Sequence, residues 1–247
     1  MSRFLKVLSR TPISILTRKI GKRRSRIFAS RQTREMEISY SPCKNSELAI
    51  LFDRHGSDKS ILLQGKAGNH NYADVYEMLF HGFRNIPFSL FECGIGTTNS
   101  TIANNMGREG KPGASLRAWR DYFPKARILG ADIDRSIIFS EERIKTVYVD
   151  QTDSDSIKAM WDALGSLSVK IIIDDGLHTF QAGVSLFENS IHMLEIGGAY
   201  VIEDVSYQNL GLFRAYFEER GIEASFIRLL TTEISSFSNN NLILIRN

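Results

Sequence analysis

The segment that decides the fold of this 247-residue chain spans residues 88–97 and reads Phe88-Ser89-Leu90-Phe91-Glu92-Cys93-Gly94-Ile95-Gly96-Thr97. The apolar run predicts a buried strand, and the glycines directly after it let the backbone turn tightly and approach a ligand. A dinucleotide-binding fingerprint would place a third glycine three residues after Gly96, where this chain has Asn99. The segment therefore favours the first strand and turn of a Rossmann-like sheet and disfavours NAD or FAD. A structural turn without a ligand is the alternative.

Strand and helix patterns alternate along most of the chain. We expect strands at 88–92, 127–133, 145–149, 169–173, 199–202, 225–230 and 242–245, and helices at 47–52, 72–83, 180–194 and 212–220. Gly197-Gly198 is expected to end the third helix, and the polar turn 235–241 to join the last two strands. The pattern predicts an α/β fold: a Rossmann-like, doubly wound, mostly parallel seven-stranded sheet with an antiparallel C-terminal hairpin.

Charge divides the chain into two parts. Residues 1–34 hold 11 Lys and Arg residues and no acid, whereas the remainder carries 20 basic and 28 acidic residues, a net charge of −8. We expect a basic N-terminal arm at 1–40 and one globular domain at 41–247. The acidic domain argues against nucleic acid as a partner. The arm is expected to be disordered or loosely docked. The alternatives are an amphipathic segment that contacts an anionic membrane surface or a partner protein, and a mitochondrial presequence.

The composition is that of an ordinary globular protein, with 43% hydrophobic and 24% charged residues. No apolar run approaches the roughly 18 residues that span a bilayer. Cys43 and Cys93 have neither the spacing of a metal site nor a disulfide framework. We therefore expect a protein of a reducing compartment, the cytoplasm.

Acidic and amide side chains follow the second and third of the central strands. Asp132 ends the strand 127–133, where Rossmann-like sites keep an acid that accepts the two ribose hydroxyls; Asp134 is suited to cap the next helix. Asp150 and Gln151 follow the next strand, within reach of an adenine edge, although an Asx-turn explains them as well. Residues 107–119, rich in glycine and proline, are interpreted as a loop inserted near the ligand.

A cluster of acids follows the fourth and fifth of these strands. Asp174-Asp175 and Glu203-Asp204 would repel one another at neutral pH unless a cation lies between them. Oxygen ligands without cysteine favour Mg²⁺ or Mn²⁺ over zinc. His178, three residues after Asp175, has the pKa range of a general base, with a structural role as the alternative. Helix capping is the alternative for the acids.

Taken together, these segments resemble the metal-dependent sugar O-methyltransferases of the macrocin and mycinamicin type and the related methyltransferases of bacterial polysaccharide clusters. The resemblance runs from about residue 47 to residue 205, and its segments are Gly56-Ser57-Asp58-Lys59, His70-Asn71-Tyr72, Glu92-Cys93-Gly94-Ile95-Gly96-Thr97, Gly113-Ala114-Ser115-Leu116-Arg117-Ala118-Trp119, Tyr122-Phe123-Pro124, Gly130-Ala131-Asp132-Ile133-Asp134, Ile172-Ile173-Asp174-Asp175-Gly176-Leu177-His178 and Tyr200-Val201-Ile202-Glu203-Asp204. Leu177 stands where the family usually has serine, and Cys93 where it usually has isoleucine.

The resemblance implies that residues 41–247 are an S-adenosylmethionine-dependent methyltransferase domain that acts on a hydroxyl of a sugar or saccharide. It implies His178 and Asp175 as catalytic residues, and Asp175, Glu203 and Asp204 as ligands of Mg²⁺ or Mn²⁺. Together with the strand-end positions above, we predict these S-adenosylmethionine-binding residues: Tyr72, Glu92, Gly94, Gly96, Thr97, Ser115, Arg117, Asp132, Ile133, Asp150, Gln151 and Asp174. We also expect a homo-oligomer.

Three other functions compete with this hypothesis. An NAD-dependent oxidoreductase is disfavoured by the missing third glycine and the clustered acids. A non-enzymatic binding module would have no need to keep acids that repel one another. A methyltransferase for another acceptor, such as a catechol or RNA, stays open; a catechol would chelate the metal as well as a sugar diol does.

Overall fold

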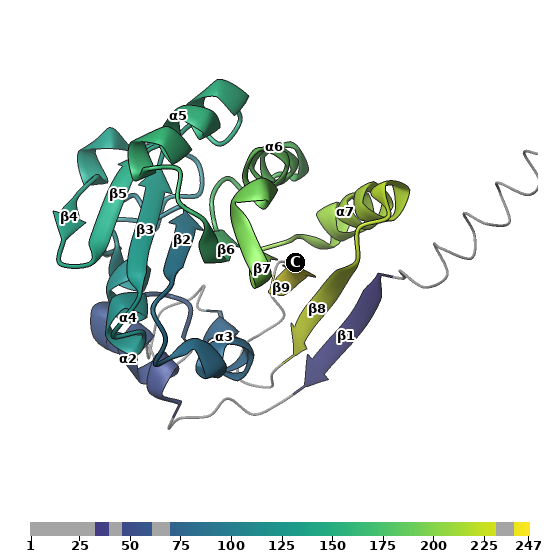
Figure 1. The fold of residues 1–247 in the computed structure, drawn as a ribbon, viewed down its shortest axis with the longest axis horizontal. Helices are drawn as coiled ribbons and strands as arrows, with labels where there is room; N and C mark the ends of the chain where they lie inside the picture. Colours follow the sequence, from purple (N-terminus) through teal and green to yellow (C-terminus); the bar gives the residue numbers. More distant parts are fainter. Residues whose placement is uncertain (1–32, 40–45, 61–69, 231–239) are drawn as a thin grey trace, which may run out of the picture.

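The computed structural model of the chain describes residues 33–39, 46–60, 70–230 and 240–247. In this part of the chain, nine strands form one sheet in the order β1-β8-β9-β7-β6-β2-β3-β5-β4 (Figure 1). The central strands β7, β6, β2, β3 and β5 are parallel, and β9 is antiparallel to both β7 and β8. Chain order runs outward in opposite directions from β2 and β6, so the ligand crevice of such a sheet is expected at their carboxyl ends.

The elements follow one another as β1 (Arg34–Ser39), α2 (Glu47–His55), α3 (Tyr72–Phe80), β2 (Ser89–Cys93), α4 (Ala114–Tyr122), β3 (Arg127–Asp132), β4 (Ser140–Glu141), β5 (Ile144–Tyr148), α5 (Ser154–Leu164), β6 (Val169–Asp174), α6 (Phe180–Ser190), β7 (Leu194–Ile202), α7 (Tyr207–Arg220), β8 (Ala224–Leu230) and β9 (Asn241–Arg246). Short 3₁₀ turns lie at His81–Phe83, Arg135–Ile137 and Ile191–Met193.

Helices cover both faces of the sheet, and each face has its own apolar core. Helices α2, α3 and α4 pack on one face around Trp119, whereas α5, α6 and α7 pack on the other around Trp161 (Figure 1). Neighbouring residues of a strand point to opposite faces, so Ile171 lies in the first core and Ile172 in the second. This explains why the central strands are apolar throughout. The predicted α/β, doubly wound, mostly parallel sheet with an antiparallel C-terminal hairpin is confirmed.

The number of strands was predicted wrongly, since the sheet has nine strands and the sequence pattern predicts seven. The first additional strand, β1, lies within the segment assigned to the basic arm and pairs in parallel with β8. Its residues alternate charged and apolar side chains at the edge of the sheet, so no long apolar run marks it. The second, β4, is a two-residue strand antiparallel to β5.

Two local predictions are corrected as well. Gly197-Gly198 does not end a helix: α6 ends at Ser190, and the glycines lie inside β7 at an irregularity, where Val169 pairs with Leu194 but Ile171 pairs with Ala199. The predicted loop 107–119 becomes helical from Ala114 onward, because Gly113 adopts a left-handed conformation with φ of 74° and serves as the N-cap of α4.

The predictions about residues 1–32 of the arm and most of the turn 235–241 lie outside the described residues. None of the described helices has the length and apolar character required to cross a membrane. The expected homo-oligomer stays a prediction.

Candidate active site

A cavity of about 420 Å³ opens at the carboxyl ends of the central strands. Its wall includes these residues predicted to bind a cofactor: Gly94, Gly96, Thr97, Ser115, Asp132, Ile133, Asp150 and Gln151. Gly94 has φ of 85°, and a Cβ atom there would lie 2.0 Å from the carbonyl oxygen of Asp175. Position 94 therefore requires glycine, because the loop after β6 crosses directly over the turn after β2.

Asp132 is fixed at the end of β3 by backbone groups. Its two carboxylate oxygens accept hydrogen bonds from the amides of Ile95, at 2.8 Å, and Asp134, at 2.9 Å. Burial raises the pKa of Asp132, and the backbone donors oppose that shift. Asp134 caps the 3₁₀ turn that follows, as expected, and accepts a hydrogen bond from the Thr97 hydroxyl.

Four residues predicted to bind the cofactor do not line the cavity: Tyr72, Glu92, Arg117 and Asp174. Tyr72 is fully buried and donates its hydroxyl to Asp204 Oδ1 at 2.6 Å. Arg117 turns outward, pairs with Glu141 at 2.7 Å and lies over the ring of Phe139. These two side chains therefore support other residues of the molecule and do not face the cavity.

Glu92 and Asp174 lie behind the cavity wall. Glu92 is fully buried and accepts hydrogen bonds from the Ser115 hydroxyl and the Trp119 indole, each at 2.7 Å. Asp174 accepts a hydrogen bond from the Gln151 side chain at 2.6 Å, and burial raises the pKa of Asp174 to about 6. Both carboxylates orient residues that do reach the cavity, namely Ser115 and Gln151.

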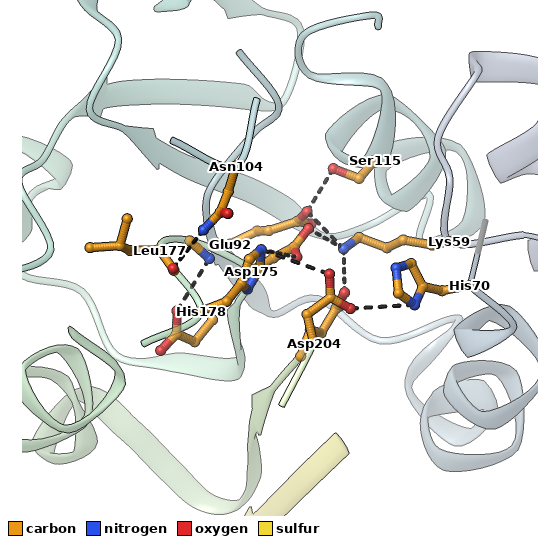
Figure 2. Close-up of polar contacts among 12 residues, drawn as sticks. Lys59, His70, Glu92, Asn104, Ser115, Asp175, Leu177, His178 and Asp204 are labelled. Atoms are coloured by element: carbon orange, nitrogen blue, oxygen red, sulfur yellow. Dashed lines mark hydrogen bonds and ion pairs between the residues drawn. The ribbon is translucent and has the colours of Figure 1, made fainter. Parts of the chain in front are cut away.

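Asp175, His178 and Asp204 converge at the other end of the cavity (Figure 2). One ligand atom from each lies within 4.8 Å of the others, the spacing of a site that can hold a metal ion. His178 Nε2 lies 3.9 Å from Asp175 Oδ1 and 3.7 Å from Asp204 Oδ2. The end of β6 and the end of β7 thus deliver one carboxylate each, with the imidazole beside both.

Glu203, predicted as a third metal ligand, does not belong to this group. It is 1% exposed, and its carboxylate accepts hydrogen bonds from the Tyr76 hydroxyl on one oxygen and from Lys59 Nζ, at 2.6 Å, on the other. Both oxygens of Glu203 therefore face groups behind the site. In Asp175, by contrast, only one carboxylate oxygen faces Lys59. Oδ2 accepts a hydrogen bond from Lys59 Nζ at 2.5 Å, and Oδ1 faces His178.

Lys59 is the functional residue that the sequence analysis missed. Its side chain is 2% exposed, and its ammonium group lies among Asp175, Glu203 and Glu92, the last at 3.6 Å (Figure 2). It belongs to the Gly56-Ser57-Asp58-Lys59 segment, which carried the resemblance without an assigned role. The sequence signal that could have identified Lys59 was the cluster of acids, because such a cluster requires a cation. The ammonium group of Lys59 is one such cation.

The charges of this cluster are strongly coupled. Burial alone would lower the pKa of Lys59, but the carboxylates of Asp175, Glu203 and Glu92 raise it well above its usual range, so the ammonium stays charged. Burial raises the pKa of Glu203 to about 8, against the opposing effect of Lys59, and Asp175 shifts in the same direction. The Lys59 ammonium thus offsets only part of the cost of burying these carboxylates.

The pKa of His178 is shifted in the direction that suits a general base. Burial lowers the pKa of His178, Lys59 and His70 lower it further, and Asp204 opposes the shift. The imidazole is therefore neutral at neutral pH and able to accept a proton, and its Nε2 atom faces the two carboxylates.

Curated proteins with similar sequences are O-methyltransferases. The chain is 34% identical over 184 residues to 8-demethyl-8-alpha-L-rhamnosyl tetracenomycin-C 2'-O-methyltransferase of Streptomyces olivaceus, a match that covers 74% of this chain and 44% of that protein. It is 27% identical over 179 residues to mycinamicin VI 2''-O-methyltransferase of Micromonospora griseorubida, over 72% of this chain and 41% of that protein. This chain is a relative of sugar O-methyltransferases. The resemblance inferred from the sequence is confirmed.

The match to these sugar O-methyltransferases is partial in length, because the chain spans less than half of the curated relatives. No family model matches the chain. Among solved structures, the MycE methyltransferase from the mycinamycin biosynthetic pathway, in complex with Mg, SAH and mycinamycin VI, superposes with a TM-score of 0.60 at 23% identity. That superposition covers 82% of this chain and 55% of MycE. The likeness establishes that the chain has a methyltransferase fold.

Proposed function

We propose that this protein is an S-adenosylmethionine-dependent and Mg²⁺-dependent O-methyltransferase that acts on a hydroxyl of a sugar or saccharide. The observation that carries the proposal is the layout of one cavity. Asp132, the acid suited to ribose hydroxyls, lies in the same 420 Å³ space as Asp175, His178 and Asp204. A cofactor anchored at Asp132 would direct its reactive end toward the acids and the imidazole.

The side chains at the acidic end fit a hard divalent cation. Asp175 and Asp204 each present a carboxylate oxygen, and the group contains no thiolate. Such oxygen donors suit Mg²⁺ or Mn²⁺. Asp175 and Asp204 would hold the ion directly, whereas Glu203 would act through Lys59 and Tyr76, which occupy its oxygens. A bound ion would supply Lewis acidity and lower the pKa of an acceptor hydroxyl.

The remaining steps belong to side chains of this chain. His178, neutral because burial lowers its pKa, would take the hydroxyl proton at Nε2. The acceptor oxygen would then bond to the methyl carbon as the carbon–sulfur bond breaks, and S-adenosylhomocysteine would leave. The sulfonium methyl is already activated, so the main contribution of the protein is to hold oxygen, carbon and sulfur in line. Asp132, Gly94 and Gly96 would fix the cofactor for that alignment.

The names of the relatives support a sugar as the acceptor. They include a 2'-O-methyltransferase and a 3'-O-methyltransferase for rhamnosyl tetracenomycins, and MycE was solved with Mg, SAH and mycinamycin VI. A vicinal diol of a sugar would also chelate a cation between Asp175 and Asp204 through both of its oxygens.

Calorimetric titration with S-adenosylhomocysteine, with and without Mg²⁺ and with NAD as a control, tests the proposal. We expect micromolar binding of S-adenosylhomocysteine and no binding of NAD. A screen of rhamnosides and other glycosides with labelled S-adenosylmethionine would then identify the acceptor. Absence of S-adenosylhomocysteine binding under both conditions would overturn the proposal and favour a non-enzymatic binding module.

The metal is tested separately by Asp175→Asn. Removal of this charge should weaken Mn²⁺ binding, measured by electron paramagnetic resonance of the free ion. Unchanged titration curves would exclude Asp175 as a ligand.

A further inference from the structure

The loop between β6 and α6, residues 175–179, carries both Asp175 and His178, and the backbone of His178 has an unfavourable conformation. His178 has φ of 57°, in the left-handed region that residues with a Cβ atom rarely adopt. Asp204, on the loop after β7, shares this property with φ of 54°. Such conformations persist at functional sites only where neighbouring groups hold them. The left-handed conformation of His178 therefore requires groups that hold it in place.

Three side-chain amides from three other segments hold this loop by its backbone. Asn104 donates to the carbonyl oxygen of Leu177 at 2.6 Å (Figure 2). Gln151 accepts from the amide of Leu177 at 2.8 Å and also donates to Asp174. Asn209 donates through Nδ2 to the carbonyl oxygen of His178 at 3.1 Å. The backbone on both sides of the His178 Cα atom is thus fixed from outside the loop.

Asn209 differs from the other two amides in its place. Asn104 and Gln151 line the cavity, whereas Asn209 does not and lies in the first turn of α7. The backbone amide of Asn209 donates to the Oγ atom of Ser206, the N-cap residue of α7, at 3.2 Å. Val205, just before that cap, is held in turn, because the Asn241 side chain donates to its carbonyl oxygen at 2.7 Å. Asn209, five residues after Asp204, therefore connects His178 to the start of α7, which is itself held by hydrogen bonds.

The bond from Asn209 is not part of the capping of α6. Thr179 is the N-cap of α6 and accepts from the amide of Ala182 with its own hydroxyl. The first backbone bond of the helix runs from Gly183 to the carbonyl oxygen of Thr179. The carbonyl of His178 is thus outside the helix, and its bond to Asn209 acts on the conformation of the loop.

We propose that Asn209 is a positioning residue for His178. By holding the His178 carbonyl it fixes the left-handed backbone and so directs the imidazole toward Asp175 and Asp204, linking the loop of the base to the loop of Asp204. The inference rests on the proposed function, in which His178 is the base. It extends that function to a residue that touches neither the cavity nor the reacting atoms.

Histidine-selective ¹⁵N labelling tests the proposal without a substrate. The chain has 5 histidines, so the ring spectrum is sparse, and His178→Gln assigns the signal of His178. In Asn209→Leu, which keeps the size of the side chain but removes the donor, we expect the His178 ring signal to shift or broaden. Signals of His55 and His192 should stay in place and show that the protein is folded. Asn209→Ala is the second variant if Asn209→Leu does not fold.

Asn189→Leu is the matched control. The Asn189 amide also donates to a backbone carbonyl, that of Ser185 at 2.8 Å, and it lies on α6 away from the cavity. This variant should leave the His178 signal unchanged. Asn209→Gln, which retains the donor, should restore part of the wild-type signal. An unmoved His178 signal in Asn209→Leu, or an equal change in Asn189→Leu, would overturn the proposal.

Kinetics supply the second readout. Loss of an orienting partner of this kind costs on the order of 10- to 100-fold in activity. With the acceptor from the glycoside screen, Asn209→Leu should lower kcat by about 10-fold or more while KM for S-adenosylmethionine stays near wild type. If the protein shows no methyl transfer at all, the proposed function fails, but the ring spectra still decide whether Asn209 positions His178.

Discussion

The two ends of the cavity hold their carboxylates in different ways. At the cofactor end, defined here by Glu92, Asp132 and Asp134, most partners are neutral donors: backbone amides for Asp132, and the Ser115 hydroxyl and Trp119 indole for Glu92. At the acidic end, defined by Asp175, Glu203 and Asp204, the partners are the Lys59 ammonium and the hydroxyls of Tyr72 and Tyr76.

This difference indicates which end requires a cation. Neutral donors make the hydrogen bonds of the acids at the cofactor end, where Glu92 also has the Lys59 ammonium 3.6 Å away, so this end requires no further cation. The acids of the acidic end are crowded, and burial raises the pKa values of Asp175 and Glu203 more than the Lys59 ammonium lowers them. A divalent cation would complete the balance.

Removal of His178 should give the largest effect. We expect His178→Ala to lower turnover by roughly 10²- to 10⁴-fold, the usual contribution of a general base. Affinity for S-adenosylhomocysteine, measured by calorimetry, should stay near wild type because His178 acts at the acidic end. His192→Ala, at an exposed histidine, is the control and should retain full turnover. Comparable turnover in the two variants would exclude His178 as the base.

Removal of Lys59 should destabilise the folded protein. In Lys59→Met the buried acids lose their internal cation, and breaking such a pair costs about 3–5 kcal/mol. Urea unfolding in the presence of EDTA should show this loss, and Mg²⁺ should recover more stability in the variant than in the wild type.

Lys158→Met provides the comparison for Lys59. Lys158 pairs with Asp155 at 3.0 Å but is 63% exposed, and surface pairs contribute about 1 kcal/mol or less. Equal losses in the two variants would show that Lys59 does not offset the acidic end.

Much of the fold was predictable, because the central strands carry apolar runs that lie between two cores. Ile171, Ile172 and Ile173 alternate between these cores, and a strand of that kind has a strong sequence signal. The edge strands have no such signal: β1 alternates charged and apolar residues, and β4 has two residues. The glycines of β7 resemble a helix stop because their role, a bulge against β6, depends on a partner strand far away in the sequence.

The site was predictable where a residue follows a strand and hard to predict where it acts across the sheet. Asp132, Asp175 and Asp204 each lie at or just after a strand end, so topology alone brings them to one edge. Lys59 reaches the same edge from the segment after α2, 116 positions before Asp175. Asn209 approaches His178 from α7. No periodicity encodes such contacts, and they follow only from the assembled sheet.

Asp174, which lies behind the cavity wall, should give the stability of the protein a distinct pH dependence. Burial raises the pKa of Asp174 from about 3.8 to about 6, and its Oδ2 has no hydrogen-bond partner among the described residues. The folded protein thus retains a proton that the unfolded chain releases between these values, so stability falls as pH rises through this window. The shift corresponds to about 3 kcal/mol.

Asp174→Asn should remove that part of the pH dependence. In urea unfolding at pH 4, 5, 6 and 7, the stability of the variant relative to wild type should increase by about 2.4 kcal/mol from the lowest pH to the highest, because the unfolded-state carboxyl is already largely ionised at pH 4. A difference that is constant with pH, or that decreases, would contradict the raised pKa of Asp174.

Ser115→Ala should give the smallest effect, at the cofactor end. The variant removes one neutral donor from Glu92, whose bond to Trp119 remains. A hydrogen bond of this kind contributes about 0.5–1.5 kcal/mol, so affinity for S-adenosylhomocysteine should fall by roughly 3- to 10-fold in calorimetry. Ser166→Ala removes a similar serine–carboxylate bond, to Asp162 at 3.0 Å on the surface, and should leave that affinity unchanged. A loss of stability in Ser115→Ala as large as that in Lys59→Met would refute the contrast between the two ends, because Glu92 would then depend on its hydroxyl donor as strongly as the acidic end depends on its cation.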